Sequence, residues 1–523
     1  MTASVLGSAL DALMFLSLCG LILTGVPVVF VLTGCAVAFA ALGSALGVFD
    51  PFLLRALAQR IFGTMTSEVL VAIPLFVFMG IMLERSKIAE ELLETMGSLF
   101  GRVRGGLAVS VSAVGALLAA STGIVGATVV TMGLMALPAM LRRGYDKGFA
   151  TGSICAAGTL GQIIPPSTVM VILGEVLAAA YQQAQLAQGK FTVETVSVGQ
   201  LFAGAMIPGL LLVGLYILYQ LGRAWLRPTI APPIPAEELG AVGLGRLLGV
   251  LVPPLVLIVA VLGSILGGIA TPTEAASVGA VGATLLAARR QGGAAARLAP
   301  WAGLAALGLA LLGAVFDMRL GRELVPTADR LAMAVAGFLV LVLALGLLLA
   351  LWSLGRAGIL ARVCESTTTI TAMIFATLVG ATLFALVFRG LGGEETVKEL
   401  LAALPGGMWG ALATVMAVMF LMGFFLDFVE ITIIVIPIVG PVLLAMGMDP
   451  IWLGVLIAIN LQTSFLTPPF GFALFYLAGV APKEVGARDI YRGIAPFVAL
   501  QLLALAIVAA FPGLATWLPR ALF

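Results

Sequence analysis

Two stretches of this chain repeat the same pattern of prolines, glycines and aspartates at a constant separation of 303 positions. The first stretch carries Pro138, Gly144, Asp146, Pro165 and Pro166, and the second carries Pro441, Gly447, Asp449, Pro468 and Pro469. Because the separation holds while the apolar residues between these positions change, the repeat indicates a duplicated backbone structure rather than shared composition.

Each copy ends in a proline pair inside an apolar segment. Proline lacks a backbone N–H and disfavours the α conformation of the preceding residue, so helical hydrogen bonds are lost there. Unsatisfied backbone groups are costly in hydrocarbon and persist only where protein or a water-filled cavity satisfies them. Paired interruptions in corresponding halves are typical of a transporter's binding site. The alternative is that both pairs are packing kinks.

The composition predicts an all-α polytopic membrane protein. Hydrophobic residues make up 61% of the 523 residues and charged residues 10%, with a mean hydropathy of +1.18. Many apolar runs reach the roughly 20 residues that cross a bilayer. No run of soluble-domain composition is longer than a loop, which argues against a separate catalytic or nucleotide-binding domain.

Charge and rare residues exclude several functions. A net charge of +2 gives no support to nucleic-acid binding. The chain has no histidine, the commonest proton carrier and transition-metal ligand at neutral pH. Its four cysteines lack metal or redox spacing. We therefore expect no enzyme activity and no cofactor.

Loop charges orient the two copies. Basic residues flank a hairpin-like segment at about 106–141, namely Arg102, Arg104, Arg142, Arg143 and Lys147. By the positive-inside rule both of its ends face the cytoplasm. A second such segment, at about 409–446, is flanked mainly by Glu394, Glu395, Glu399 and Asp449, which fits the opposite face. The two copies are therefore predicted to be inverted.

Both hairpin-like segments are polar and glycine-rich at their centres, which is typical of re-entrant hairpins whose tips reach the midplane. We expect each tip to face the interrupted helix of its own copy. Carbonyl and hydroxyl oxygens suit a hard cation of sodium's size. The candidate ligands are Thr122, Gly123, Gly161, Ile164 and Pro166 in the first copy, and Gly423, Ser464, Thr467 and Phe470 in the second. The alternative is that these hydroxyls bond back to their own helices.

Polar residues inside apolar segments are candidates for the substrate path, because burying a charge in a membrane is costly. Asp427 and Glu430, three apart, are expected on one helical face near the second tip. Three alternatives are open for these acids: they line the substrate path, one of them is protonated, or they lie nearer the membrane–water interface. Ser167 and Asn460 are further candidates, although Asn460 is also explained by a bond to a neighbouring helix. Glu175 and Glu274 are two further acids in apolar surroundings, and Glu274 is equally explained as a helix N-terminal acid.

These residues resemble the large permease subunit of the tripartite ATP-independent periplasmic (TRAP) transporters, over nearly the whole chain. The motifs that carry the resemblance are Ala72 to Gly80, Gly144-Tyr145-Asp146, Gly158 to Ser167, Ala270 to Ala276, and Asn460 leading to Thr467-Pro468-Pro469-Phe470-Gly471. The resemblance implies sodium-coupled import of organic acids, with no cofactor beyond the coupling ion Na⁺. It also implies two partners, an extracytoplasmic solute-binding protein and a small four-helix membrane subunit, in a bacterial or archaeal cytoplasmic membrane.

The resemblance further implies an elevator-type inverted-repeat fold with two re-entrant hairpins and two interrupted helices. Its expected layout is N-terminal scaffold helices (1–105), first hairpin and interrupted helix (106–181), scaffold helices of both halves (182–288), an inserted helix pair (289–362), a scaffold or arm helix (363–408), second hairpin and interrupted helix (409–481) and a C-terminal helix (482–523). The N-terminal stretch from Leu10 to about Leu46 is either one long span or two short ones.

Two departures from the family pattern stand out. At the first tip the family usually has Ser-Gly-Ser-Ser, whereas this chain has Thr122-Gly123-Ile124-Val125 and lacks two hydroxyls. The first ion site must then depend more on main-chain carbonyls, or be weaker. The pair of spans near 298–316 and 331–354 is an apparent insertion with an expected peripheral role. Other functions kept open are a stand-alone sodium–carboxylate symporter, a passive channel and an ABC-type permease.

Overall fold

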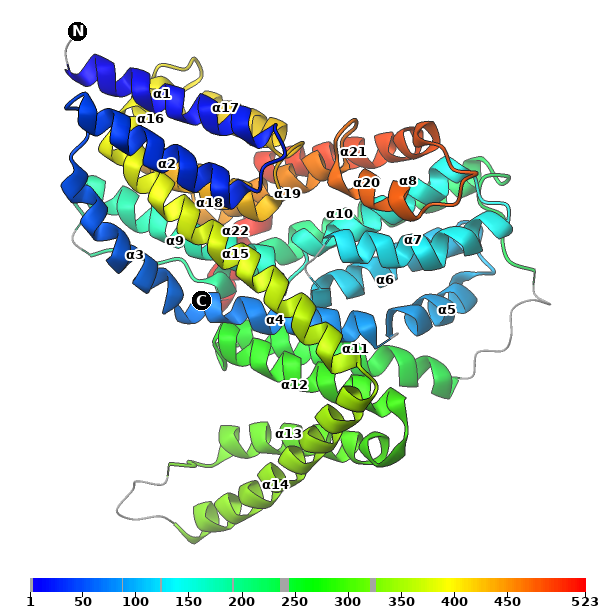
Figure 1. Ribbon diagram of the computed structural model, residues 1–523. Coiled ribbons are helices and arrows are strands. Elements are labelled where there is room, and N and C mark those ends of the chain that lie inside the picture. Colours follow the sequence, from blue (N-terminus) through cyan, green and yellow to red (C-terminus); the bar gives the residue numbers. More distant parts are fainter. Residues whose placement is uncertain (1–2, 87, 123–124, 191, 236–243, 320–325) are drawn as a thin grey trace.

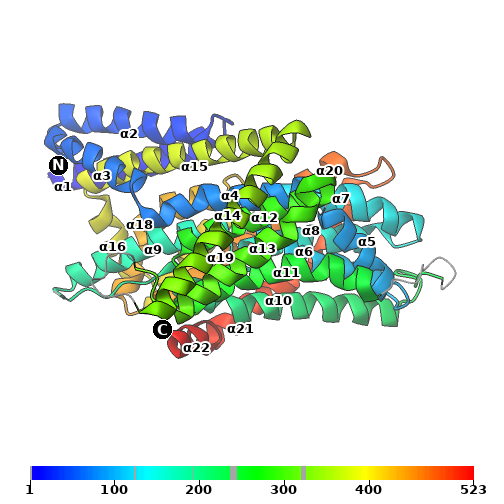
Figure 2. The same cartoon turned by 90° about the horizontal axis from the view of Figure 1, so that it is seen from below.

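The computed structural model describes residues 3–86, 88–122, 125–190, 192–235, 244–319 and 326–523, and this part of the chain is helical without a strand. Figures 1 and 2 show long helices that run roughly along one direction of the molecule. Ten helices of the described part are long and apolar enough to cross a membrane. The predicted all-α polytopic membrane protein is therefore confirmed.

The helices fall into three stretches along the chain. The first comprises α1 (Ala3–Ile22), α2 (Val28–Ala45), η1 (Pro51–Arg55), α3 (Ala56–Met65), α4 (Glu68–Arg85), α5 (Ile88–Phe100), α6 (Gly106–Thr122), α7 (Val125–Arg142), α8 (Lys147–Thr159), η2 (Leu160–Gln162), α9 (Thr168–Ala187) and α10 (Val198–Leu226). The second comprises α11 (Leu244–Leu266), α12 (Pro272–Gln291), α13 (Gly293–Val315) and α14 (Thr327–Arg356). The third comprises α15 (Ile359–Gly390), α16 (Gly393–Ala402), α17 (Gly407–Met422), α18 (Phe428–Ala445), α19 (Pro450–Leu466), α20 (Phe472–Val480), α21 (Ala487–Ala510) and α22 (Gly513–Leu522).

The structure resolves one open alternative and moves several expected boundaries. The N-terminal stretch, expected as one long span or two short ones, forms two helices, α1 and α2, which pack against each other. The C-terminal region also forms two helices rather than one, because Pro512 follows Phe511 and the residue before a proline leaves the α region. Helix α9 extends beyond position 181 to Ala187, since its alanines and glutamines favour helix. Helix α15 begins at Ile359, inside the segment assigned to the insertion.

Both predicted interruptions are present. Helix α8 passes through one turn of 3-10 helix and breaks at the first proline pair before α9 starts, and α19 breaks at the second pair before α20. The two prolines of each pair are joined by a cis peptide bond. Asp146 and Asp449 begin the interrupted helices, and their carboxylates accept hydrogen bonds from backbone N–H groups of the first turn. The repeated sequence pattern therefore corresponds to a repeated backbone structure, a helix that begins at an aspartate and breaks at a proline pair.

The two copies brace each other in a symmetric way. Helices α6 and α7 pack on α8, and α17 and α18 pack on α19. Across the copies, α7 packs along α20 and α18 packs along α9, so equivalent helices make equivalent contacts. Such reciprocal contacts are typical of two-fold symmetry. Figure 1 shows α6 and α7 toward one end of the molecule and α17 and α18 toward the other.

Helices α13 and α14, which are expected from the sequence to be an insertion, form a pair that projects from the rest of the molecule (Figure 1). They pack against each other and against α12. Only 17% of α13 and 11% of the most apolar part of α14 is buried. Their surfaces are apolar, with large exposed side chains such as Trp301, Phe338 and Trp352. This peripheral position keeps the pair apart from the two repeated elements.

Candidate ion and substrate site

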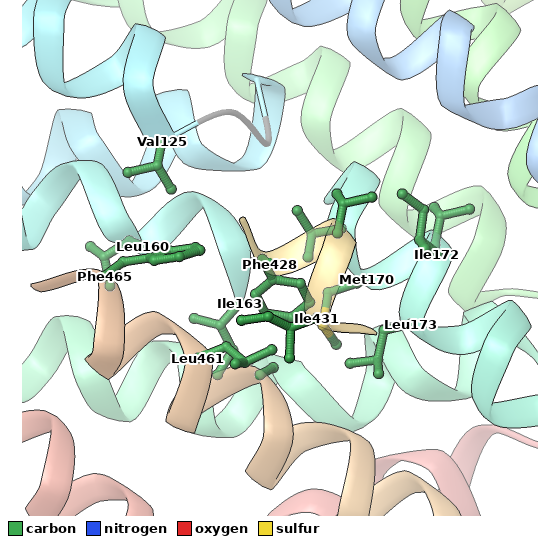
Figure 3. Close-up of a cluster of buried hydrophobic side chains, with 14 of the residues drawn as sticks. Val125, Leu160, Ile163, Met170, Ile172, Leu173, Phe428, Ile431, Leu461 and Phe465 are labelled. Carbon is green, nitrogen blue, oxygen red and sulfur yellow. The ribbon is translucent and has the colours of Figure 1, made fainter. Parts of the chain in front are cut away.

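The two interruptions and the start of α18 meet at one apolar cluster. Figure 3 shows side chains from the first interruption, from the beginning of α9, from α18 and from the end of α19 close together. The cluster includes Leu160, Ile163, Met170, Phe428, Ile431, Leu461 and Phe465, all of them buried. The two broken helices therefore converge with the second hairpin inside the protein, where hydrogen-bonding groups are scarce and each polar atom matters.

The second tip lies directly on its own interrupted helix, as predicted. Gly423 ends α17, and a Cβ atom added there would overlap the side chain of Ser464 on α19. The Ser464 hydroxyl is fully buried and donates to the Leu461 carbonyl at 2.7 Å. The Ser464 hydroxyl proton is thus bonded within its own helix, as the alternative expected. Its lone pairs remain as acceptors.

Thr467 stands at the point where α19 ends. Its hydroxyl donates to the Thr463 carbonyl at 2.7 Å, and its own carbonyl accepts from the Gly471 N–H at 3.1 Å. The side chain is half-buried, so its oxygen reaches the edge of the break. Phe470 is exposed, and its ring lies 5.3 Å from that of Phe425, which follows the tip. Four candidate ligands of the second copy therefore lie on the tip and on the break that it faces.

In the first copy the structure places only part of the predicted set. Gly161 lies in the short 3-10 helix η2, and Ile164 and Pro166 lie in the break that follows it. Within the described residues, no hydrogen bond reaches the carbonyls of Ile164 or Pro166. The side chain of Thr122 and all of Gly123 lie outside the described part of the structure.

Ser167 is a polar residue that directly follows the first proline pair. It is the residue before α9, with an exposed fraction of 0%, and its hydroxyl has no hydrogen-bond partner among the described residues. A buried hydroxyl without a protein partner is uncommon and is available to a ligand or an ordered water. Ser167 therefore remains a candidate.

Asp427 and Glu430 differ from the expected arrangement on one helical face. Asp427 precedes α18, and its carboxylate accepts from the Phe428 N–H at 2.7 Å. The Asp427 N–H donates to the Glu430 carboxylate at 3.1 Å, so the two acids form a capping box. The spacing of three residues between the two acids is here the spacing of a capping box, and it keeps both acids together at the start of α18 beside the second tip. Asp427 is exposed and Glu430 is half-buried.

Three other polar candidates also have structural partners. Asn460 is buried, and its amide donates to the Met416 carbonyl of α17 at 2.9 Å, so its side chain joins two helices, as the alternative expected. Glu274 forms a capping box with Thr271 at the start of α12. Glu175 accepts a hydrogen bond at 3.0 Å from the hydroxyl of Ser67, the residue before α4.

The comparison with protein families decides what kind of chain this is. The model for the tripartite ATP-independent periplasmic transporter, DctM component, matches residues 15–514. The chain belongs to this family. As a DctM-family permease it is a component of a transporter and not an enzyme. The tripartite family implies a small membrane subunit and a solute-binding protein as partners.

Relatives of this permease have several named substrates. The C4-dicarboxylate TRAP transporter large permease protein DctM of Pseudomonas aeruginosa is 29% identical over 475 residues, which cover 90% of this chain and 91% of the relative. The ectoine TRAP transporter large permease protein TeaC of Halomonas elongata is 25% identical, with 97% and 99% covered. The sialic acid TRAP transporter large permease protein SiaM of Vibrio cholerae is 23% identical, with 96% of each chain covered.

A solved structure also resembles the permease in fold. The YdaH transporter of Alcanivorax borkumensis, whose crystal structure is described as having an unusual topology, superposes with a TM-score of 0.53 at 15% identity. The match covers 90% of this chain and 89% of that one. This likeness concerns the fold alone.

Sequence reasoning missed a buried polar cluster at the centre of the permease. Thr159 and Gln462 hydrogen-bond each other at 3.4 Å and are themselves 303 positions apart, so they are equivalent residues of the two copies. Gln501 donates to the Tyr216 hydroxyl at 2.7 Å and lies 3.4 Å from the Thr159 hydroxyl. All four side chains are fully buried. The constant separation could have identified the first pair, whereas Gln501 and Tyr216 come from helices outside the repeat.

This cluster gives a stability prediction. Replacing Gln501 by leucine should lower the free energy of unfolding by about 1–3 kcal/mol, because the buried Tyr216 hydroxyl loses the donor at 2.7 Å and keeps only its interactions with Thr159 and Gln462. The double variant Gln501→Leu with Tyr216→Phe should recover part of this loss, since neither polar group then remains unpaired. Thermal unfolding of the purified protein in detergent measures both. A double variant as unstable as the sum of the two single ones would show that the bond is not the cause.

Proposed function

We propose that this permease imports organic acids by sodium-coupled symport, as the large membrane subunit of its transporter. Substrate is delivered by an extracytoplasmic solute-binding protein, and a small four-helix subunit accompanies the permease in the cytoplasmic membrane. The observation that carries the proposal is the contact between the Gly423 tip and the broken helix that contains Ser464 and Thr467. It places the backbone of the tip beside a helix whose Ser464 and Thr467 hydroxyls lie at or just before its break.

The chemistry at this break favours a hard cation. The ligands offered are hydroxyl and carbonyl oxygens, and the described residues contain no cluster of three or more metal-binding acids, cysteines or histidines. Sodium suits such an oxygen set better than a transition metal. In addition, the positive end of the α18 dipole is capped by the chain's own Asp427 and Glu430. That capping favours a cation over an anion beside the second tip.

The mutual bracing of the two copies supports an elevator mechanism. Helices α6 to α9 and α17 to α20 pack on one another reciprocally, which favours their movement as one body. In this mechanism that body slides against a scaffold that includes α4, α10, α12 and α15. The two hairpins would be re-entrant, each with its tip near the middle of the membrane, and would enter from opposite sides.

An organic acid is the substrate class that we propose. Among the relatives, the names of the C4-dicarboxylate and sialic acid permeases specify acids, and the ectoine permease specifies a zwitterion. Permeases with different named substrates are thus similar to this chain to nearly the same degree. This fits a permease whose substrate selectivity depends largely on its binding protein.

Uptake in proteoliposomes tests this proposal. The permease and its small subunit are reconstituted together, and the binding protein with a labelled organic acid is added outside. We expect accumulation against a concentration gradient, and uptake should collapse when either the sodium gradient or the binding protein is omitted. Sodium-dependent uptake without the binding protein would instead indicate a stand-alone symporter. Uptake that only equilibrates would indicate a passive channel.

A further inference from the structure

A cavity of about 400 Å³ lies apart from the tips, between two groups of helices. One wall comes from α9 and α18, which carry parts of the repeated unit, and the other comes from α3, α4 and α15. Figures 1 and 2 both show α3 beside α15 and α9 beside α18. The volume falls within the roughly 300–1,000 Å³ of small-molecule sites.

Two arginines line this cavity from neighbouring helices. Arg60 comes from α3 and Arg389 from α15, and their positive charges repel each other. Arg60 is exposed, and no acidic side chain pairs with it in the described part of the chain. Arg389 is also paired with Glu394, so Arg60 supplies the cationic group of this lining that has no acidic partner among the described residues, and this group attracts an anion.

Arg389 is held in a fixed position at the cavity wall. Its guanidinium contacts the Glu394 carboxylate at 3.1 Å and donates to the Gln183 side-chain oxygen at 2.8 Å. The Gln183 amide in turn donates to Glu394 at 2.8 Å. This closed set of bonds joins α9, α15 and the start of α16. It orients a guanidinium group in advance of binding, which lowers the entropic cost of holding a ligand.

The remaining lining suits a small organic molecule. Glu175 is the acid among the lining residues, and its carboxylate accepts a hydrogen bond from Ser67. The rest is mostly apolar or small, including Val176, Leu378 and Ile433. A mostly apolar cavity with a few fixed polar groups is typical of ligand sites.

We propose that this cavity is a second binding site, in which Arg60 and Arg389 hold the carboxylate group of a small organic acid. Guanidinium groups bind carboxylates through paired, charge-assisted hydrogen bonds. The choice of a carboxylate rests on the proposed function, whereas the site itself lies apart from the sodium-ligand set. The elevator mechanism moves two groups of helices relative to each other, and each group forms one wall of the cavity. Occupancy of the cavity by a ligand should therefore depend on the relative position of the two groups.

Binding of succinate to the purified full-length permease tests the site. The protein is placed in phosphatidylcholine nanodiscs without sodium, and potassium succinate is added while thermal unfolding is followed. Ligand that binds only the folded state raises the unfolding midpoint. We expect a saturable rise with succinate, none with potassium chloride at equal ionic strength, and none with neutral succinamide. Absence of a saturable rise would overturn the proposal.

Variants identify the residues involved. Arg60→Gln should raise the half-saturating succinate concentration about tenfold or more, since a charge-assisted bond is lost, and Arg60→Lys should weaken binding less. Arg55→Gln is the matched control, because Arg55 lies over the Phe52 ring and does not line the cavity. An equal effect of both glutamine variants, or none from Arg60→Gln, would refute the assignment.

Two further measurements distinguish this cavity from the sodium site and from a lipid-binding site. Thr467→Val should leave the succinate effect unchanged, so a failure of sodium-coupled uptake would not remove this site. A lipid phosphate shares the chemistry of a carboxylate, and nanodiscs containing phosphatidylglycerol test that source. Stabilisation by phosphatidylglycerol that abolishes any response to succinate would show that the cavity holds a lipid headgroup and would overturn the proposal.

Discussion

Replacing Gly423 by alanine is expected to reduce sodium-driven uptake by about tenfold or more while the protein still inserts into the membrane. The added methyl group would overlap the Ser464 side chain, so the second tip must move away from the interrupted helix. Overpacking of this kind costs typically 1–3 kcal/mol, and each 1.4 kcal/mol corresponds to a factor of ten. The backbone of Gly423 is already in the right-handed helical region, so the effect comes from contact and not from backbone strain.

Uptake by proteoliposomes that contain equal amounts of inserted protein measures this effect. Gly479→Ala is the matched control, because it adds the same methyl group to α20 in a position with open space around it. It should leave uptake unchanged. If Gly423→Ala transports as well as the wild type, the contact between tip and broken helix has no role in transport.

Replacing Thr467 by valine is expected to raise the half-saturating sodium concentration about tenfold. Valine keeps the shape of the side chain but removes the oxygen whose lone pairs lie at the break. Loss of a hydrogen-bond-like contact with a charged group costs about 1.5–3 kcal/mol, which corresponds to a factor of ten or more. Uptake measured as a function of sodium concentration checks this, and Thr467→Ser should retain most of the affinity.

Thr463→Val separates ion binding from helix stability. Thr463 lies one turn earlier in α19, and its hydroxyl donates to the Ile459 carbonyl in the way that Thr467 bonds to Thr463. Its replacement should leave the sodium dependence unchanged. Equal effects at both positions would mean that the hydroxyls stabilise the helix end, and our assignment of the Thr467 oxygen would be wrong.

The helices and their two matched breaks could be predicted from local chemistry together with the repeat. A proline pair removes two N–H donors but does not by itself end a helix, since Pro253 and Pro254 lie inside α11, so the matched spacing of the two repeated pairs was the informative signal. Aspartates at positions 146 and 449 accept hydrogen bonds from the N–H groups that follow them. The same local chemistry explains Glu274, for which the helix-start alternative is correct. For Asp427 and Glu430 the same spacing also fits a capping box, which the structure has, and their place on the substrate path stays a prediction.

Partners from distant segments could not be predicted in the same way. Nothing near Asn460 in the sequence indicates that its amide bonds to α17, and nothing near Gln501 indicates Tyr216. Both bonds depend on which helices lie side by side. The cavity between α3, α9 and α15 depends on the same choice, since its two arginines are far apart in the chain.

The sequence by itself determined that this chain crosses a membrane, that it contains a duplicated element and that each copy is broken at a proline pair. These properties follow from hydrophobic length and from the missing N–H of proline, which act within a few residues. Only the tertiary structure decided that α7 lies along α20 and α18 along α9, and that Gly423 touches Ser464. Such contacts depend on how whole apolar helices fit together, and apolar surfaces attract one another without specifying a partner.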